Sequence, residues 1–166
     1  MPSVRVSAVV GKQRRVVLAR ILRNTDLHAG ILEICDTTGI VTGAIVTAIG
    51  SLRRAEVSWA IPSEKTRRGS ERMPPVQIEG PVEVLSAQGV VCVADPAMPV
   101  IHLHGVVCDA KGQVRGGHFL SGNNPVHTTM DVVVTEIEGV RIEAEYDAEI
   151  DLVLPVPKGL SKLRRE

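Results

Sequence analysis

Three of the five histidines of this chain lie in one short stretch, IHLHGVVCDAKGQVRGGHFLSGNN, residues 101–124. Histidine is the commonest protein ligand of transition metals and the usual acid or base near neutral pH. His102 and His104 are two residues apart, so on a strand both side chains point to the same side, with Cα atoms about 6.5 to 7 Å apart. The spacing therefore predicts that two imidazoles can reach one ion.

His118 supplies a third imidazole after the D-x-K-G turn that begins at Asp109. Gly116 and Gly117 precede it, and their missing side chains allow close backbone approach or a positive φ. A return strand would place the third ring beside the other two. Three histidines with an open fourth position are typical of a catalytic or exchangeable zinc-type site. We predict a divalent transition metal there, zinc first, and the alternative is that these histidines line a subunit interface.

Other polar residues are candidates for supporting roles around such a metal. A ligating imidazole normally donates its other N–H to an oxygen or another acceptor. Asp109, Asp131 and His127 are therefore predicted to lie next to the ligands. His28, on a predicted helix, is interpreted as a surface or interface residue rather than a ligand.

The elements that must position these residues begin with a strand at residues 16–22, VVLARIL, whose apolar composition predicts that both faces are covered. After this strand, the spacing of the apolar residues changes to that of a helix. Leu27, Ile31, Ile34 and Cys35 fall at i, i+4, i+7 and i+8, so they share one helix face. Thr25 or Asp26 is the predicted N-cap, and Gly39 stands where a left-handed residue would end the helix.

The rest of the chain has the period-two pattern of strands. We predict strands at residues 40–52 and 53–61 with a break near Gly50, an exposed loop at 62–75, strands at 76–80, 81–94 and 100–108, and a hairpin at 126–146 with Glu-Gly at its turn. Many strands around one helix indicate an α+β domain built on an antiparallel or mixed sheet. The predicted boundaries are an N-terminal segment 1–14, a domain 15–146 and an extended basic tail 147–166.

Composition supports a strand-rich core in a reducing compartment. Hydrophobic residues make up 44% of the chain, with one Trp, one Tyr and one Phe, so the core should be aliphatic and β-branched. The three cysteines form no C-x-x-C pair, which argues against a disulfide framework or a four-cysteine zinc site. Without a signal-peptide pattern or a long apolar run, we expect a cytoplasmic location. Strands this apolar also suggest burial against another subunit.

Charge is unevenly distributed although it sums to zero. Residues 1–72 carry twelve Lys and Arg against six Asp and Glu, whereas residues 73–157 carry three against twelve. Such asymmetry can mark a polyanion-binding face or complementary oligomer surfaces. The candidate polyanion-binding residues are Arg53, Arg54, Arg67, Arg68 and Arg72. Neutral total charge, the absence of a helix-turn-helix pattern and the few aromatic residues imply that any DNA binding is weak and salt-sensitive.

The chain resembles the plant and prokaryote conserved (PPC) domain family, whose members are often described as DNA-binding proteins. The resemblance rests on TDLHAGILEICDTTGIVTGAIVTAIGSLRRAEV, on EGPVEVLSAQG and on HLHGVVCDAKGQVRGGHFLSGNNPVHTTMDVVV. It implies an α+β fold that assembles as a homotrimer, with a metal at His102, His104 and His118.

The resemblance also bears on partners. The family's interaction motif corresponds to Gly80, Glu83 and Leu85, and in plant members it is linked to protein partners. The plant members bind DNA through an Arg-Gly-Arg hook outside this domain, and Arg68-Gly69-Ser70 is the nearest match here. The expected function is a DNA-associated regulatory protein with a three-histidine metal site. The alternative is a metal-dependent hydrolase or lyase acting on a small anionic substrate in a cleft between subunits.

Overall fold

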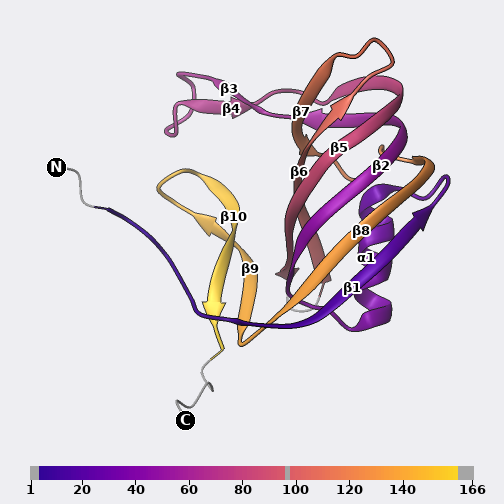
Figure 1. Cartoon of the computed structure of the whole chain (residues 1–166). Coiled ribbons are helices and arrows are strands. Elements are labelled where there is room, and N and C mark those ends of the chain that lie inside the picture. Colours follow the sequence, from indigo (N-terminus) through magenta and orange to yellow (C-terminus); the bar gives the residue numbers. More distant parts are fainter. Residues whose placement is uncertain (1–3, 96–97, 161–166) are drawn as a thin grey trace.

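A computed structural model describes residues 4–95 and 98–160 of the chain (Figure 1). Strands dominate it, and in these residues one α-helix is present. The elements in chain order are β1 (Lys12–Leu22), α1 (Leu27–Thr38), β2 (Gly43–Ser58), β3 (Ala60–Pro62), β4 (Ser70–Arg72), β5 (Val76–Asp95), β6 (Met98–Cys108), β7 (Val114–Phe119), β8 (Val126–Glu138), β9 (Val140–Asp147) and β10 (Leu152–Gly159). The predicted α+β class with an antiparallel or mixed sheet is confirmed.

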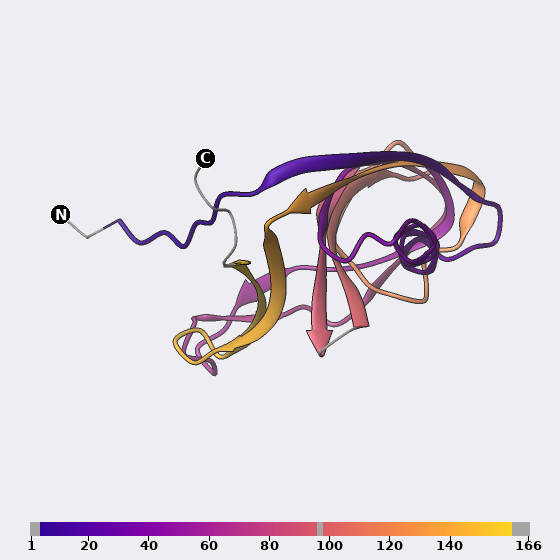
Figure 2. The same ribbon diagram turned by 90° about the horizontal axis from the view of Figure 1, so that it is seen from below.

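The main sheet has the strand order β1-β8-β2-β7-β6-β5-β9-β10. Its named pairings are antiparallel except for a parallel contact between β5 and β9 at Val93 and Glu143. An additional pairing of β2 with β5 makes the sheet curl back on itself through β6 and β7. Figure 2 shows this curvature, with α1 seen end-on inside the bend. The aliphatic core fills the space between the curved sheet and the helix.

The helix begins and ends where the sequence predicts. The side chain of Asp26 accepts hydrogen bonds from the backbone N–H groups of His28 and Ala29 at 3.0 and 3.2 Å, which satisfies N-terminal donors. Gly39 has φ 69°, a left-handed conformation that costs glycine little. The predicted apolar face is buried, with Leu27, Ile31 and Cys35 at 0%, 0% and 1% exposure.

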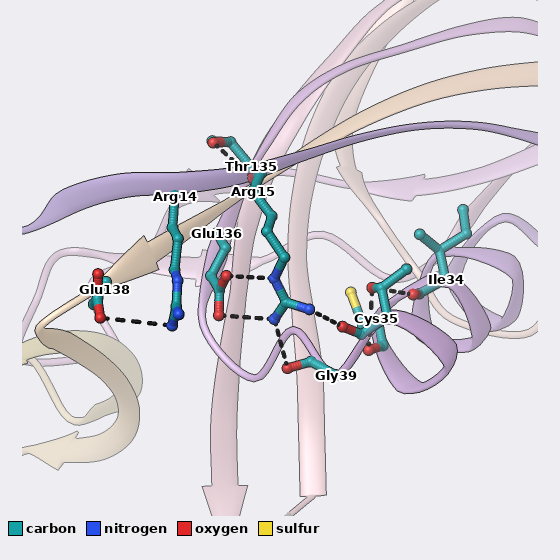
Figure 3. Close-up of polar contacts among 9 residues, drawn as sticks. Arg14, Arg15, Ile34, Cys35, Gly39, Thr135, Glu136 and Glu138 are labelled. Carbon is teal, nitrogen blue, oxygen red and sulfur yellow. Dashed lines mark hydrogen bonds and ion pairs between the residues drawn. The ribbon is translucent and has the colours of Figure 1, made fainter.

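One arginine ties the helix end to the sheet. The Arg15 guanidinium of β1 donates to the Glu136 carboxylate of β8 at 2.7 and 3.0 Å and also to the carbonyls of Thr38 and Gly39 (Figure 3). A cation at a helix C-terminus is favourable because the last carbonyls carry partial negative charge. The same guanidinium lowers the pKa of the Glu136 carboxyl below its ordinary value. This contact joins three elements at the end of the helix.

Two sequence predictions about strands differ from the structure of the single chain. Within one chain, strand β1 is covered on one face only, because Leu18 is 77% exposed and Val16 58% exposed while Ile21 is buried. Strands β8 and β9 do not form the predicted hairpin at Gly139. β8 pairs with β1 and β2, whereas β9 pairs with β10 and β5. Gly139 instead marks the point where the chain leaves the curved sheet, with φ 80°.

Three further segments also differ from expectation. β2 runs without a break through Gly50, where the sheet accommodates a register shift. The predicted loop 62–75 contains most of a small hairpin, in which β3 pairs with β4. The predicted extended tail contains β10, which pairs with β9, and its basic end at 161–166 lies outside the described residues. In the described part of the chain, no helix has the length and apolar character that a membrane crossing requires.

Candidate metal centre

Strand alternation on β6 separates the histidines from the core. Leu103 is fully buried, while its neighbours point to the opposite side, where His102 is half-buried and His104 is exposed. β6 continues through the turn at Asp109 into β7, and His104 is the register partner of His118. The predicted return strand therefore brings the third imidazole beside the first two.

Two glycines allow β7 to pack closely at this point. A Cβ atom at Gly116 would lie 2.6 Å from the carbonyl oxygen of Gly105, and one at Gly117 would lie 2.6 Å from that of Ser58. Real Cβ atoms do not approach backbone oxygens so closely. The absence of side chains lets β7 fit between β6 and the end of β2, where Ser58 pairs with His118.

The three imidazoles form a compact cluster. Their ring centroids are 4.8 Å apart for His102 and His104, 5.1 Å for His102 and His118, and 5.2 Å for His104 and His118. One nitrogen from each ring lies within 4.8 Å of the other two. Zinc–nitrogen bonds are about 2.0 to 2.1 Å long, so small side-chain rotations let all three nitrogens reach one ion.

The protein environment favours the neutral forms of His102 and His118. Burial, then the positive charge of Arg72 and then the neighbouring histidines lower the pKa of His118 to about 4. Burial, His104 and Arg72 also lower the pKa of His102 from its ordinary value. A neutral imidazole has the free lone pair that a metal needs. The buried Nδ1 of His118 has no hydrogen-bond partner within residues 4–95 and 98–160. The cluster thus has the donor chemistry of a metal site.

A pocket of about 300 Å³ includes this cluster. The three histidines line it together with Trp59, which lies between β2 and β3, with Glu71 and Arg72 of β4, and with Leu152 of β10. Trp59 is 41% exposed and Leu152 37% exposed, so both offer apolar surface to a ligand. The pocket combines nitrogen donors, the positive side chains of Arg68 and Arg72, and an apolar wall.

The β3–β4 hairpin is held against the β9–β10 turn. Arg67 donates to the carbonyl of Ala148 at 3.1 Å, and Arg68 donates to the carbonyls of Ile150 and Asp151 at 3.4 and 3.1 Å. These contacts place Arg72 and Leu152 around the same pocket. The other predicted polyanion-binding residues, Arg53 and Arg54, belong to β2 and do not line it.

The candidate supporting residues lie as follows. The Asp109 carboxylate accepts hydrogen bonds from the backbone N–H groups of Lys111 and Gln113, both at 2.9 Å, and so stabilises the β6–β7 turn. The Asp131 carboxylate on β8 pairs with Arg20 at 2.8 Å. His127 is half-buried at the start of β8. None of the three has a hydrogen bond to the clustered imidazoles among the described residues, so their role beside the ligands stays a prediction.

His28 differs from its prediction as a surface or interface residue. It is 4% exposed at the start of α1, and its Nδ1 has no hydrogen-bond partner in the described part of the chain. Burial lowers its pKa, and it is close enough to His118 to contribute to the lowered pKa of that ring. His28 lies three residues before Ile31 and seven before Cys35, both on the apolar face, and this helical spacing could have signalled burial.

The residues predicted to form an interaction motif lie on β5. Glu83 and Leu85 alternate with buried Val82 and Val84, and Leu85 is 51% exposed. Sequence reasoning missed Trp59, Glu71 and Leu152 as pocket residues. They are far from the histidines in the sequence and carry no motif, so only the fold brings them together.

The curled mixed sheet with a single helix places this chain among the α+β proteins. The family model of the Plants and Prokaryotes Conserved (PCC) domain matches residues 8–138, and the chain belongs to this family. None of the curated proteins compared with the chain matches it significantly.

Several solved structures share the fold. A metal-containing protein of Archaeoglobus fulgidus is 25% identical, with a TM-score of 0.76 over 91% of this chain and 99% of that chain. A plant- and prokaryote-conserved protein of Pyrococcus horikoshii is 22% identical, with a TM-score of 0.71 over 90% of this chain and 97% of that one. A protein of Ralstonia eutropha described as a candidate DNA-binding protein is 20% identical, with a TM-score of 0.64 over 85% of this chain and 89% of that one.

Proposed function

We propose that this protein binds one divalent transition metal ion, zinc first, through His102, His104 and His118, with a further coordination position open to the pocket. The observation that carries the proposal is the convergence of three imidazole nitrogens within 4.8 Å of one another in a pocket of about 300 Å³. The lowered pKa of His118 supports it, because protons then compete with a metal only well below neutral pH. The metal-containing relative of Archaeoglobus fulgidus is consistent with it.

Such an ion would supply Lewis-acid chemistry, polarising a ligand oxygen or lowering the pKa of a bound water to roughly 7. The chain's own residues would bind and orient the ligand. Arg72 would attract negative charge, and Trp59 and Leu152 would exclude water from an apolar ligand body. This arrangement suits the hydrolase or lyase alternative, in which a small anionic substrate binds beside the ion.

Elemental analysis tests the proposal. Untagged protein purified without chelator should hold close to one equivalent of zinc or another divalent ion per chain. The double variant His102→Ala/His118→Ala should lose it, whereas Arg23→Gln, a change at an exposed residue of the turn before α1, should keep it. Wild-type protein that cannot take up a divalent ion, or a double variant with unchanged metal content, would show that the cluster has no metal-binding role.

We also propose that the protein forms a homotrimer through the outer face of β1, β8 and β2. This face carries exposed apolar side chains on neighbouring strands, including Leu18, Val46 and Ile49 at 77%, 50% and 47% exposure. Leu18 is the register partner of Val133 on β8, which extends the apolar surface. Apolar surface of this kind on a chain with a complete core favours subunit contact. Native mass spectrometry should give three chains, and a monomer at micromolar concentration would contradict the assignment.

A DNA-associated regulatory role is the second candidate. It is supported by the description of the Ralstonia eutropha relative and by the arginines of the β3–β4 hairpin, which three subunits would present together. Binding should be weak and mostly sequence-independent, since phosphate contacts by surface arginines carry no base readout. A duplex-DNA titration should show retention at low salt that falls steeply as salt rises. No retention even near about 50 mM salt would eliminate this role.

The three cysteines are all free thiols, which fits the proposed cytoplasmic location.

A further inference from the structure

The pocket beside the histidines contains a positive charge that the fold itself does not use. Within residues 4–95 and 98–160, the Arg72 guanidinium has no hydrogen-bond acceptor and no ion-pair partner. Other arginines of the same chain are engaged, since Arg67 and Arg68 bond to carbonyls and Arg15 and Arg20 pair with carboxylates. An exposed guanidinium needs no partner, but this one lines the pocket together with all three histidines. Its charge therefore lies where a bound ligand can use it.

The electrostatic position of Arg72 is also unusual for a metal site. Its positive charge is close enough to His102 and His118 to disfavour their protonated forms. The same charge repels a bare divalent ion, so it opposes the metal unless an anion lies between them. A guanidinium presents donors that match the two oxygens of a carboxylate, and a divalent ion also favours carboxylate oxygen. One carboxylate can compensate both charges.

The other residues that line the pocket restrict the size and polarity of the ligand to which that carboxylate belongs. Trp59 and Leu152 offer apolar surface on the lining, which favours an organic body over an inorganic anion. The pocket is lined by a second arginine, Arg68, whose guanidinium is held by backbone carbonyls, and by the Glu71 carboxylate, which has no ion-pair partner in the described part of the chain. Glu71 offsets the charge of Arg68, so among the described residues Arg72 remains as the one uncompensated side-chain charge beside the ion, which disfavours a second negative charge on the ligand. A volume of about 300 Å³ is at the small end for ligand sites. The combination selects a small monoanion.

We propose that this pocket binds a small monocarboxylate whose carboxylate is shared between the histidine-bound metal and Arg72, with its apolar chain against Trp59 and Leu152. This inference rests on the proposed metal site and deepens it by naming the ligand class. Arg72 and Leu152 are specificity-determining residues. The hairpin contacts of Arg67 and Arg68 with the β9–β10 turn bring both of them to the site.

The test uses the intact protein loaded with Co²⁺, whose visible absorption reports on the ligands of the ion. Butyrate, acetate and inorganic phosphate are titrated separately, and Trp59 fluorescence gives a second reading because it is the chain's one tryptophan. Metal content is measured on the same samples. We expect butyrate to change the spectrum and to bind roughly fivefold or more tightly than acetate, since its additional methylenes bury apolar surface. Phosphate should bind more weakly than butyrate.

Variants separate the two parts of the site. Arg72→Gln should keep its metal and weaken butyrate binding by about tenfold or more, because a charge-assisted pair is lost. Arg23→Gln, a change at an exposed arginine of the turn before α1, should bind butyrate like the wild type. Leu152→Ala should weaken butyrate binding several-fold while leaving acetate binding unchanged.

The outcomes distinguish this inference from the metal site on which it rests. Protein that takes up Co²⁺ but shows no response to carboxylates, or an Arg72→Gln variant that binds butyrate as the wild type does, would overturn the inference and leave the metal site standing. Phosphate that binds more tightly than butyrate would overturn the carboxylate assignment. Protein that takes up no Co²⁺ would remove both.

Discussion

The lowered pKa of His118 predicts how acid affects the metal-free protein. In the folded chain this pKa is about 4, compared with an ordinary value of 6.5. Between these two values the unfolded chain binds the proton that the folded chain rejects. The free energy of unfolding therefore rises with pH in this window. The stabilising contribution of the neutral His118 is lost as pH falls from about 6.5 toward 4.

The size of the loss follows from the shift. Each pKa unit corresponds to 1.36 kcal/mol, so the complete shift is worth about 3 kcal/mol. His118 is half-buried rather than fully enclosed, and screening by solvent reduces the effect. We expect a loss of about 2 kcal/mol in the free energy of unfolding between pH 6.5 and pH 4.5. Protonation would also place an N–H on the buried Nδ1, which has no acceptor among the described residues.

Urea unfolding at half-unit pH steps, on protein stripped of metal by chelator, measures this loss. His118→Gln is the matched variant, because glutamine is polar and does not titrate. Its curve should be flatter than that of the wild type, while carboxylates such as Glu136 remain the same in both proteins. Parallel curves for wild type and variant across this range would refute the account of His118.

Three further changes test the fold and the assembly. Leu103→Ala should lower the free energy of unfolding by about 2 to 5 kcal/mol in urea titrations, because Leu103 is fully buried, and a loss below about 1 kcal/mol would contradict its assignment to the core. Leu18→Glu should convert the proposed trimer to monomers in native mass spectrometry, and a variant that remains trimeric would place the interface elsewhere. Arg15→Ala should lower the melting temperature by releasing α1 from β8, and an unchanged value in differential scanning calorimetry would show that this contact adds no stability.

Local patterns determined the parts of this protein that depend on neighbours in the sequence. The helix was predictable because the cap at Asp26, the left-handed Gly39 and the apolar period between them act within a few residues. The pair of His102 and His104 was predictable because strand alternation is local. The approach of His118 was predictable because a short turn returns the chain directly to β6.

Pairing between distant strands was decided by the tertiary structure. The Glu-Gly sequence at Gly139 is compatible with a hairpin, but β8 is already paired on both edges, with β1 and β2, so β9 must find another partner. The outer face of β1 is as apolar as its inner face in sequence. Only the curvature of the sheet shows which face meets the helix and which remains exposed.

The sequence by itself therefore determined the three metal-ligand candidates, the helix and the strand-rich class. The tertiary structure decided that His28 is buried near His118 and that Arg72, Trp59 and Leu152 line one pocket with the histidines. The physical reason is that ligand spacing within one hairpin is set by local backbone geometry. A pocket wall built from three separate segments depends instead on how the whole sheet curls and where its edge strands pair.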